Sequence, residues 1–349
     1  MFTSPTITSI ANAALSARLQ HKIDFKTKPL GALGQLESLG LQLGLIQRSE
    51  TLVFTQPQMV VFAADHGVAS EGVSAFPQAV TMQMVANMLA GGAAINVLAR
   101  QHGFALHVVD AGVAGDLPCD VMSHPQLIKR KVAHGTANMA HGPAMSVEQL
   151  HNALQAGADV LASLPGNVAA FGDMGIANTS PAALLLHRLA GVSIEDATGR
   201  GTGLTDPQLL HKQAVLAKAA ALHASATAPL HALAALGGFE IAMMTGAMLQ
   251  AASERRVILV DGFIAGSAAL VACALATAAK DYMVFCHRSA ERGHHLMLTH
   301  LQAKPLLDLG MRLGEGTGAL LAWPLVQSAA LLMNEMASFE SAGVSGKAD

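Results

Sequence analysis

The sequence predicts an α/β fold in which helices cover both faces of a parallel β-sheet. Short apolar runs of strand length alternate along the chain with longer helical segments, the order typical of a parallel sheet. Four of the five runs lead into an aspartate and the last into a histidine, and open α/β sheets place ligand groups at these ends. Because 52% of the 349 residues are hydrophobic and 13% are charged, the chain can bury a large core.

The expected strands are short and almost wholly apolar, as buried parallel strands are. They cover residues 59–64, 104–109, 167–171, 257–260 and 282–286. The residues that follow or end them are Asp65, Asp110, Asp173, Asp261 and His287.

Helices are expected where apolar residues recur at helical spacing. They cover residues 7–20, a segment ending near Leu45, 80–101 with an interruption at 91–92, 146–162, an alanine-rich stretch after Pro181, 206–225 and 228–252. Residues 117–143 contain polar turns and several histidines and are expected to be irregular.

Residues 262–279 are uncharged and mostly apolar for 18 residues, the length at which a membrane-spanning helix is considered. Ala and Gly dominate this stretch, and it directly follows an expected strand. We therefore expect a buried helix after a buried strand, and no stable membrane span.

Helical segments at both ends of the chain lie outside the alternation of strands and helices. We expect residues 1–29 and 301–349 to pack together as a small helical domain. Residues 30–300 would then form a large α/β catalytic domain.

The formal net charge of −3 and the absence of a basic block argue against a nucleic-acid partner. Low charge combined with so much apolar residue favours an oligomer that hides part of its surface. The cysteines Cys119, Cys273 and Cys286 have neither zinc-site nor disulfide spacing, and no signal peptide is recognised. A cytoplasmic location is therefore expected.

A single carboxylate, Glu315, stands among three glycines and a threonine in residues 312–319, ahead of a long apolar run. Glycines let a backbone approach a ligand closely, and the apolar run would partly desolvate the carboxylate. Desolvation raises the pKa of a carboxylate and makes it a better general base near neutral pH. The alternative is an ordinary helix N-terminus, at which Glu315 interacts with the helix dipole.

Two glycine-rich segments suggest a phosphate site. Residues 172–180 place small residues before a helix, where exposed amides can hold a phosphate. Residues 199–203 form a second loop, in which Thr202 can add a hydroxyl and after which Lys212 can add a counter-charge. Helix capping by Asn178 or Thr179 is the alternative. The two segments suggest a phosphorylated, sugar-containing ligand, and Glu315 suggests a catalytic base.

A histidine-rich segment is the candidate for a metal site. His287, Glu291, His294 and His295 have a spacing that would place three ligands on one helix face. Gly293 interrupts that helix, so structural roles are favoured. The serine-hydrolase elbow, the P-loop and the His-Glu-x-x-His motif are absent, and the 199–203 loop follows no strand as a dinucleotide motif would.

Ten short motifs lie in a fixed order almost from end to end of the chain. They are KPLG (28–31), ADHGV (64–68), GGA (91–93), PAM (143–145), GDMGIANT (172–179), GRGTGL (199–204), GGFE (237–240), LVDGF (259–263), HRSAE (287–291) and RLGEGTG (312–318). Together they resemble the nicotinate-nucleotide–dimethylbenzimidazole phosphoribosyltransferase family of cobalamin nucleotide-loop assembly. So many motifs in one order make the resemblance highly specific.

The resemblance implies a pentosyl transfer in which nicotinate mononucleotide and 5,6-dimethylbenzimidazole give α-ribazole 5′-phosphate and nicotinate. It also implies a homodimer, a Rossmann-like large domain and a small helical domain built from both termini. Neither a metal nor a cofactor is implied.

The resemblance also implies roles for particular residues. Glu315 is expected to be the general base, with Asp173 as a second carboxylate at the site. The ribose phosphate is expected to lie among Gly175, Ile176, Asn178, Gly201, Thr202, Gly203 and Lys212. The attacking base is expected to lie near Asp65, Phe76, Met84 and Leu313.

Two departures from the family pattern leave the preferred base open. Asp173 stands where the family usually has Glu, so its carboxylate reaches one methylene less far. Phe76 and Met84 stand where some members have Ser and Gln. The more apolar pocket favours dimethylbenzimidazole or admits other benzimidazoles, purines or phenolics.

Two other functions fit parts of the sequence. A non-catalytic α-ribazole-binding protein of the same fold would lack the base, whereas Glu315 is present. A metal-dependent hydrolase would use the cluster from His287 to His295.

Overall fold

The computed structural model describes residues 2–201 and 203–345, and its centre is a six-stranded sheet in which all paired strands are parallel. The strands are β1 (Gln58–Ala64), β2 (Ala105–Gly112), β3 (Leu127–Lys129), β4 (Val168–Met174), β5 (Val257–Val260) and β6 (Met283–Phe285). Their order is β3-β2-β1-β4-β5-β6, the doubly wound order of the Rossmann fold. The predicted fold class is therefore confirmed.

Five strands lie where the sequence predicts them, and the sixth, β3, lies in the segment expected to be irregular. With three residues at the edge of the sheet, β3 is too short to show a strand pattern. The same segment contains a short helix, α5 (Cys119–Met122). The expectation that residues 117–143 lack regular structure is thus wrong in part.

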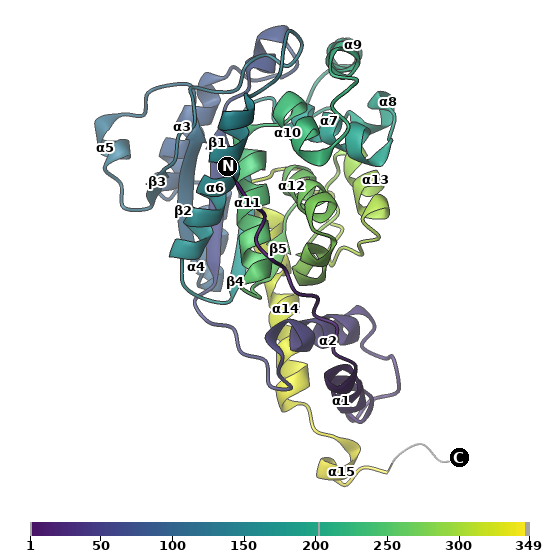
Figure 1. Ribbon diagram of the computed structural model, residues 1–349. Helices are drawn as coiled ribbons and strands as arrows, with labels where there is room; N and C mark the ends of the chain where they lie inside the picture. The colour runs from purple at the N-terminus through teal and green to yellow at the C-terminus, as the bar shows by residue number, and fades with distance from the viewer. Residues whose placement is uncertain (1, 202, 346–349) are drawn as a thin grey trace.

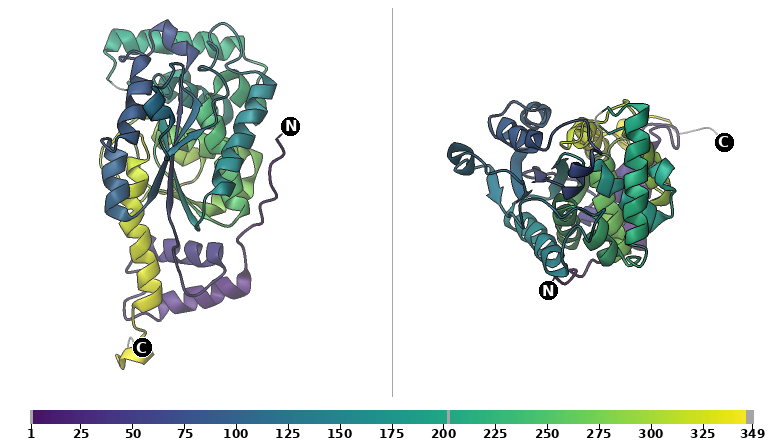
Figure 2. Two further views of the ribbon diagram at one scale, coloured as in Figure 1. Left: turned by 90° about the vertical axis from the view of Figure 1, so that its left-hand side faces the viewer. Right: turned by 90° about the horizontal axis from the view of Figure 1, so that it is seen from above.

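Helices cover both faces of the sheet (Figures 1 and 2). On one face lie α3 (Ala79–Leu89), α4 (Ala94–His102) and the N-terminal part of α14 (Thr317–Glu335). On the other lie α6 (Val147–Ser163), α11 (Phe239–Ser253) and α12 (Phe263–Leu275). A Cβ on Gly246 of α11 would overlap the Leu154 carbonyl of α6, so glycine permits the close crossing of these two helices.

Two expected helices differ in their bounds. The first begins at Ala13 instead of residue 7, because the Asn12 side chain accepts a hydrogen bond from the Leu15 amide and caps it. The helix expected at 228–252 is two helices, α10 (Pro229–Leu236) and α11, because the chain turns at Gly237 and Gly238. The remaining elements of the large unit are η1 (Gly67–Glu71), α7 (Thr179–Ala190), α8 (Ile194–Ala197), α9 (Asp206–Leu222), η2 (Thr277–Tyr282) and α13 (Arg292–His300).

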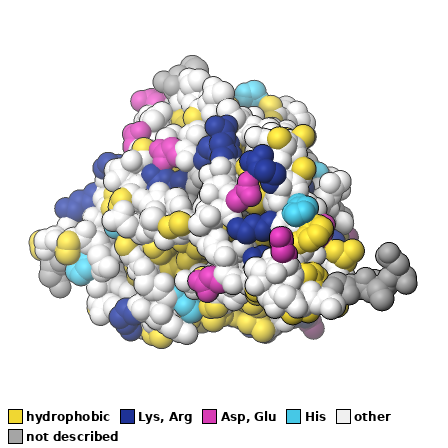
Figure 3. Space-filling view, turned by 90° about the horizontal axis from the view of Figure 1, so that it is seen from below, with side chains coloured by type: hydrophobic (Ala, Val, Ile, Leu, Met, Phe, Trp, Pro, Cys, Tyr) yellow, Lys and Arg dark blue, Asp and Glu magenta, His cyan; other side chains and the backbone are white. Residues whose placement is uncertain are grey.

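A small helical layer lies at one end of the molecule, away from the sheet (Figures 1 and 2). It contains α1 (Ala13–Asp24), α2 (Gln35–Gln47), α15 (Phe339–Ala342) and the C-terminal part of α14, and α2 packs against both α1 and α14. Viewed from this end, basic, acidic and apolar side chains are interspersed, and no continuous basic surface covers the face (Figure 3). The division into residues 30–300 and 1–29 with 301–349 stays a prediction, in which α2 belongs to the large domain.

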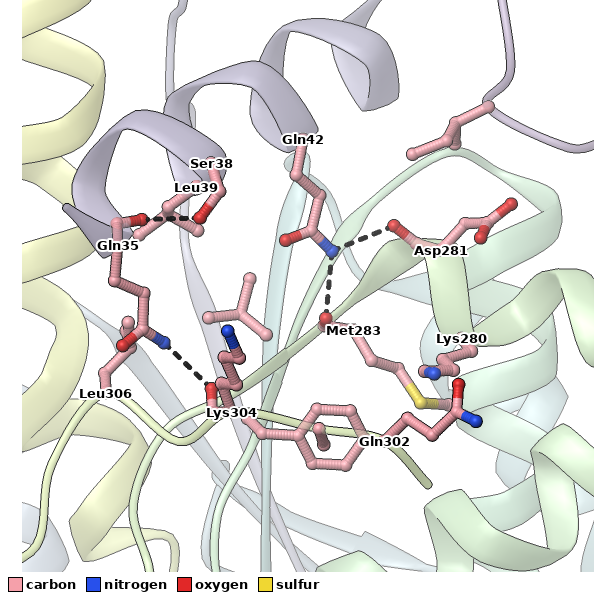
Figure 4. Close-up of a pocket in the computed structure, with 14 residues that line it drawn as sticks. Gln35, Ser38, Leu39, Gln42, Lys280, Asp281, Met283, Gln302, Lys304 and Leu306 are labelled. Carbon is pink, nitrogen blue, oxygen red and sulfur yellow. Dashed lines mark hydrogen bonds between the residues drawn. The ribbon is translucent and has the colours of Figure 1, made fainter. Parts of the chain in front are cut away.

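Helix α2 is joined to the large unit across a cavity of about 440 Å³ (Figure 4). The Gln42 side-chain amide donates to the carbonyls of Asp281 and Met283 at 3.0 Å, and the Gln35 amide donates to the carbonyl of Lys304. None of the residues expected to act in catalysis lines this cavity.

The uncharged stretch that raised the membrane question forms α12, which spans 13 residues and is buried from Phe263 to Ala272 directly after β5. The expected buried helix after a buried strand is therefore confirmed. One other stretch of the described chain, Ala79–His102, is long and apolar enough to cross a bilayer, with a mean hydropathy of 1.3. It consists of α3 and α4 with a turn between them, so it is weak support for a membrane span.

Candidate active site

The site lies where the strand order reverses. The chain leaves β1 toward β2 and later returns to place β4 on the other side of β1. Open α/β sheets bind their ligands at the carboxyl ends of the strands at such a switch point. Asp65 follows β1 and Asp173 lies at the end of β4. Asp261 follows the neighbouring β5. Because the paired strands are parallel, all five polar strand ends seen in the sequence lie at one edge of the sheet.

The glycine-rich loop that carries Glu315 closes over the end of β4. Three consecutive residues of this loop have positive φ: Gly314 at 83°, Glu315 at 63° and Gly316 at 89°. A Cβ on Gly172 of β4 would clash with the backbone of Glu315, so the loop rests directly on the strand. A non-glycine residue with positive φ is uncommon and marks a position held by its surroundings.

Glu315 is 6% exposed, and its carboxylate faces the start of α4. Its Oε2 accepts a hydrogen bond from the backbone amide of Ile95 at 3.2 Å. Burial raises the pKa of Glu315, the Ile95 amide partly opposes this, and the negative charge of Asp261 adds to it. The direction of this shift suits a general base.

Asp173 is buried beside the same loop. The side-chain amide of Asn178 donates to Asp173 Oδ2 at 2.8 Å, so Asn178 does not use its side chain to cap α7. Burial raises the pKa of Asp173 well above its ordinary value, and the charges of Asp261, Glu240 and Glu315 raise it further. Two carboxylates with raised pKa values, Asp173 and Glu315, therefore share one site.

The turn at residues 175–178 is packed tightly against the end of β1. A Cβ on Gly175 would clash with the carbonyl of Ala64. The Ile176 amide donates to Thr81 Oγ1 at 3.0 Å, and the Asn178 amide donates to the carbonyl of Gly175. These two amides are therefore engaged within the protein, which corrects the expectation that the amides of this turn are exposed.

A second group of residues surrounds the loop at 199–203. Lys212 of α9 is buried, and its Nζ donates to Thr179 Oγ1 at 2.6 Å. Arg312 donates to the carbonyl of Gly201 at 2.6 Å, which ties this loop to the segment before Glu315. Gly203 has φ +121° and open space at its Cβ position, whereas Thr202 lies outside the described residues.

Burial lowers the pKa of Lys212 to about 8, although the nearby Glu291 carboxylate opposes the shift. Lys212 still carries most of its positive charge at neutral pH. The arrangement therefore offers a cation, the Thr179 hydroxyl and a glycine-rich backbone at the N-terminus of α7, which together suit a phosphate.

The residues expected near the attacking base differ in environment. Phe76 and Leu313 expose 50% and 58% of their surface, and Met84 of α3 is half-buried. Asp65 is buried, and its Oδ2 accepts from the Ala114 amide at 2.8 Å, so this carboxylate fixes a neighbouring loop. Burial raises the pKa of Asp65.

The histidine-rich segment does not form a cluster of metal ligands. His294 is buried, His295 is exposed, and Glu291 lies toward Lys212 and the 199–203 loop. His287 lies against Asp261, with Nε2 3.4 Å from Oδ1. Within the described part of the chain, no three His, Cys, Asp or Glu side chains form a group able to hold a metal ion.

Several residues of the site were not assigned from the sequence. The sequence shows Asp261 only as a polar residue after a strand, although acids at the ends of strands that share one sheet edge do indicate a site. Single hydrogen bonds formed in the tertiary structure connect the site to Ile95, Thr81 and Arg312. The local sequence around these three residues does not indicate that they belong to the site.

A fully buried pair, His66 and Glu240, also lies beside the site, with His66 Nε2 2.9 Å from Glu240 Oε1. Burial opposes a charge on His66, but Glu240 outweighs it and the pKa of His66 is raised.

The sequence is clearly similar to those of known proteins. A family profile described as "Phosphoribosyltransferase" matches residues 8–344. The chain is 57% identical to a protein of Variovorax paradoxus (strain S110) over 99% of this chain and 98% of that protein. It is 58% identical to a protein of Cupriavidus necator, with 98% of each chain covered. Both relatives are named nicotinate-nucleotide–dimethylbenzimidazole phosphoribosyltransferase.

The fold is also similar to that of solved structures. A crystal structure described as CobT from Thermus thermophilus superposes with a TM-score of 0.91 at 42% identity, covering 96% of this chain and 100% of the other.

Proposed function

The chain belongs to the nicotinate-nucleotide–dimethylbenzimidazole phosphoribosyltransferase family, and we propose that it moves the 5-phosphoribosyl group of nicotinate mononucleotide to 5,6-dimethylbenzimidazole. The products are α-ribazole 5′-phosphate and nicotinate, and the reaction belongs to cobalamin lower-ligand assembly. Identity of 57% over 99% of the chain carries this assignment. The buried Glu315 supplies the chemistry that such a transfer needs.

Glu315 acts as the general base. A neutral benzimidazole has one N–H and one ring nitrogen with a lone pair, and loss of the proton makes the second nitrogen a stronger nucleophile. The proton passes to Glu315, the nitrogen attacks C1′ of the ribose, and the C1′–N bond to nicotinate breaks with its electron pair leaving on the pyridine nitrogen. Attack from the face opposite to the leaving group converts the β linkage into an α linkage. Because the pyridinium is already a good leaving group, no general acid is needed.

The geometry at Glu315 supports this role. Oε2 is held by the Ile95 amide, whereas Oε1 has no hydrogen-bond partner among the described residues. The raised pKa makes the carboxylate a better proton acceptor than an exposed glutamate, and general bases work best when their pKa approaches the operating pH. Asp173, fixed by Asn178, orients the ribose or the base beside it.

The 5′-phosphate binds between the two glycine-rich segments. Lys212 provides the counter-charge, and the Gly175, Ile176, Asn178, Gly201 and Gly203 positions surround the phosphoribosyl group. The contact between Arg312 and Gly201 supports this assignment because it places the phosphate loop and the Glu315 segment side by side. Fixing two substrates in line in this way contributes much of the rate.

The attacking base lies among apolar side chains. Phe76, Met84 and Leu313 present apolar surface, and Asp65 fixes the neighbouring loop through the Ala114 amide. The methyl groups of dimethylbenzimidazole suit such a lining better than a polar base does. The enzyme acts as a homodimer, which the low charge and high apolar content support. A cytoplasmic location is supported by three cysteines that have no disulfide spacing.

The deciding experiment is incubation of the purified protein with nicotinate mononucleotide and a panel of benzimidazoles, purines and phenolics. Mass analysis should show α-ribazole 5′-phosphate and one equivalent of nicotinate, with dimethylbenzimidazole used most rapidly. Binding of α-ribazole without release of nicotinate would instead support the non-catalytic alternative.

A further inference from the structure

The Asp261 carboxylate accepts two hydrogen bonds from the first turn of the helix that follows Glu315. Its Oδ2 accepts from the Gly316 amide and its Oδ1 from the Ala319 amide, each at 3.1 Å. Gly316 is the N-cap of α14 and has no side chain with which to cap the helix. A carboxylate from the end of β5 therefore takes the place of a capping side chain and also meets the positive end of the helix dipole.

The segment that Asp261 holds is conformationally unfavourable. Gly314, Glu315 and Gly316 all have positive φ, and Glu315 has a Cβ that disfavours this region. Such a conformation persists only where neighbouring groups fix it. The two hydrogen bonds to Asp261 begin at the residue directly after Glu315, so they fix the backbone next to the one non-glycine residue of these three.

The His287 side chain lies against the Asp261 carboxylate. Both side chains are buried, and His287 Nε2 lies 3.4 Å from the same Oδ1 that accepts from Ala319. The imidazole also fills the space beside Gly318, where a Cβ would clash with the ring. The backbone on either side of His287 is fixed, because Arg288 donates to the Leu307 carbonyl and Leu307 donates to the Cys286 carbonyl.

We propose that Asp261, oriented by His287, is the positioning residue that holds Glu315 in its active, left-handed conformation. The proposal rests on the proposed function, in which Glu315 is the base. It also assigns His287 the role of orienting Asp261, in place of the metal binding that its sequence spacing suggested.

The charge of Asp261 gives the proposal an electrostatic signature. The groups that face the Glu315 carboxylate are Asp261 from β5, Asp173 from β4 and the Ile95 amide from α4. Asp261 raises the pKa of Glu315, so loss of its charge lowers that pKa. The acidic limb of the pH–rate profile should therefore move to lower pH when Asp261 loses its charge. Loosening of the loop would move it in the same direction, because burial also raises the pKa of Glu315. A substitution that leaves Asp261 and the Glu315 loop in place should leave the limb unmoved.

The first arm of the test needs no activity. Asp261→Asn keeps the shape of the side chain but offers one acceptor oxygen for two amides. Hydrogen exchange of a peptide covering residues 312–320 should become about tenfold faster, since a charge-assisted hydrogen bond is lost. Asp110→Asn is the control, because Asp110 is also a buried aspartate, here within β2, and accepts from a backbone amide, that of Val113, without touching the Glu315 loop. Its other carboxylate oxygen lies 3.4 Å from Lys131 Nζ.

The second arm is kinetic. Asp261→Asn should lower kcat by about tenfold to a hundredfold with little change in the KM for the nucleotide, because a misplaced base affects the chemical step. His287→Ala should lower kcat by a smaller factor, about threefold to tenfold, as expected for the loss of one polar contact. His287→Gln keeps an N–H near the position of Nε2 and should recover most of the loss.

The outcomes separate the proposal from the proposed function. An unchanged exchange rate at residues 312–320 and an unmoved acidic limb in Asp261→Asn would overturn the positioning role. If that variant does not fold, the exchange rate of His287→Ala decides, and a rate equal to that of the wild type overturns the proposal. If the wild-type protein forms no α-ribazole 5′-phosphate, the proposed function fails, while the exchange arm still shows whether Asp261 holds the loop.

Discussion

The backbone amide of Ile95 donates to the Glu315 carboxylate at 3.2 Å, although the two residues are 220 positions apart. Ile95 lies in the first turn of α4, whose N-terminal amides carry partial positive charge. This contact stabilises the ionised carboxylate, while burial and the charge of Asp261 destabilise it. The balance leaves the pKa of Glu315 above its ordinary value, and the first prediction depends on it.

Glu315→Gln should lower kcat by about a hundredfold to ten-thousandfold, the range for loss of a general base. Substrate binding should change little, because glutamine keeps the size and the hydrogen bond from Ile95. The wild-type rate should fall as the pH drops through the raised pKa of Glu315, since only the ionised form accepts a proton, and the variant should lack this acidic limb. Steady-state kinetics across pH checks both points.

A base that has already lost its N–H proton should partly rescue Glu315→Gln. Assays at high pH, where benzimidazolate forms, provide this control. Near wild-type kcat in the variant at neutral pH would refute general-base catalysis by Glu315.

Lys212→Ala should raise the KM for the nucleotide by about tenfold to a hundredfold, as expected for loss of a charge-assisted hydrogen bond worth about 1.5–3 kcal/mol. The KM for the attacking base should change much less. Lys218→Ala, on the exposed side of the same helix, is the matched control. Equal effects of Lys212→Ala on both substrates would count against the phosphate assignment.

The lowered pKa of Lys212, about 8, adds a pH dependence. The ammonium is charged below this value and neutral above it, so the wild-type KM for the nucleotide should rise as the pH passes about 8. A KM that stays constant across this range would contradict the assignment.

Asp173→Asn should reduce kcat but leave a measurable rate. Asparagine keeps an oxygen that can accept the hydrogen bond from Asn178 but lacks the second carboxylate oxygen, so it weakens the orientation of the ribose or the base without abolishing it. Asp173→Glu should be mild. If Asp173→Asn is as inactive as Glu315→Gln, the two carboxylates share the role of the base.

Activity should survive chelator treatment and dialysis, because the histidine-rich segment is dispersed and no metal-binding group occurs among the described residues. Elemental analysis of the active protein checks this. Stoichiometric zinc whose removal abolishes activity would restore the metal-dependent hydrolase as an alternative.

Gly246→Ala should destabilise the fold, because the added Cβ would overlap the Leu154 carbonyl where α11 crosses α6. Overpacking of this kind costs about 1–3 kcal/mol. Gly142→Ala, which meets nothing within 4 Å, is the control and should leave the melting temperature nearly unchanged. Equal melting temperatures for the two variants would show that the helices can separate without cost.

The sequence determined the parts of this protein that depend on local pattern. The apolar run ending at Val260 and the aspartate after it predict a buried strand with a polar group at its carboxyl end, because strand burial and strand ends are recorded in consecutive residues. The glycines around Glu315 likewise predict a tight loop and a desolvated carboxylate. The short strand β3 and the exact start of α1 were missed, because three residues give no period and a single capping side chain sets the helix start.

The tertiary structure alone decided how the site is assembled. Ile95, Asp261 and His287 come from three different elements, and no local pattern in the sequence relates them to Glu315. The order in which the strands pair brings their carboxyl ends to one edge, and that order depends on long-range packing, such as the crossing of α6 and α11. The sequence therefore supplies the carboxylate, whereas its pKa and its strained conformation are set by groups that only folding places beside it.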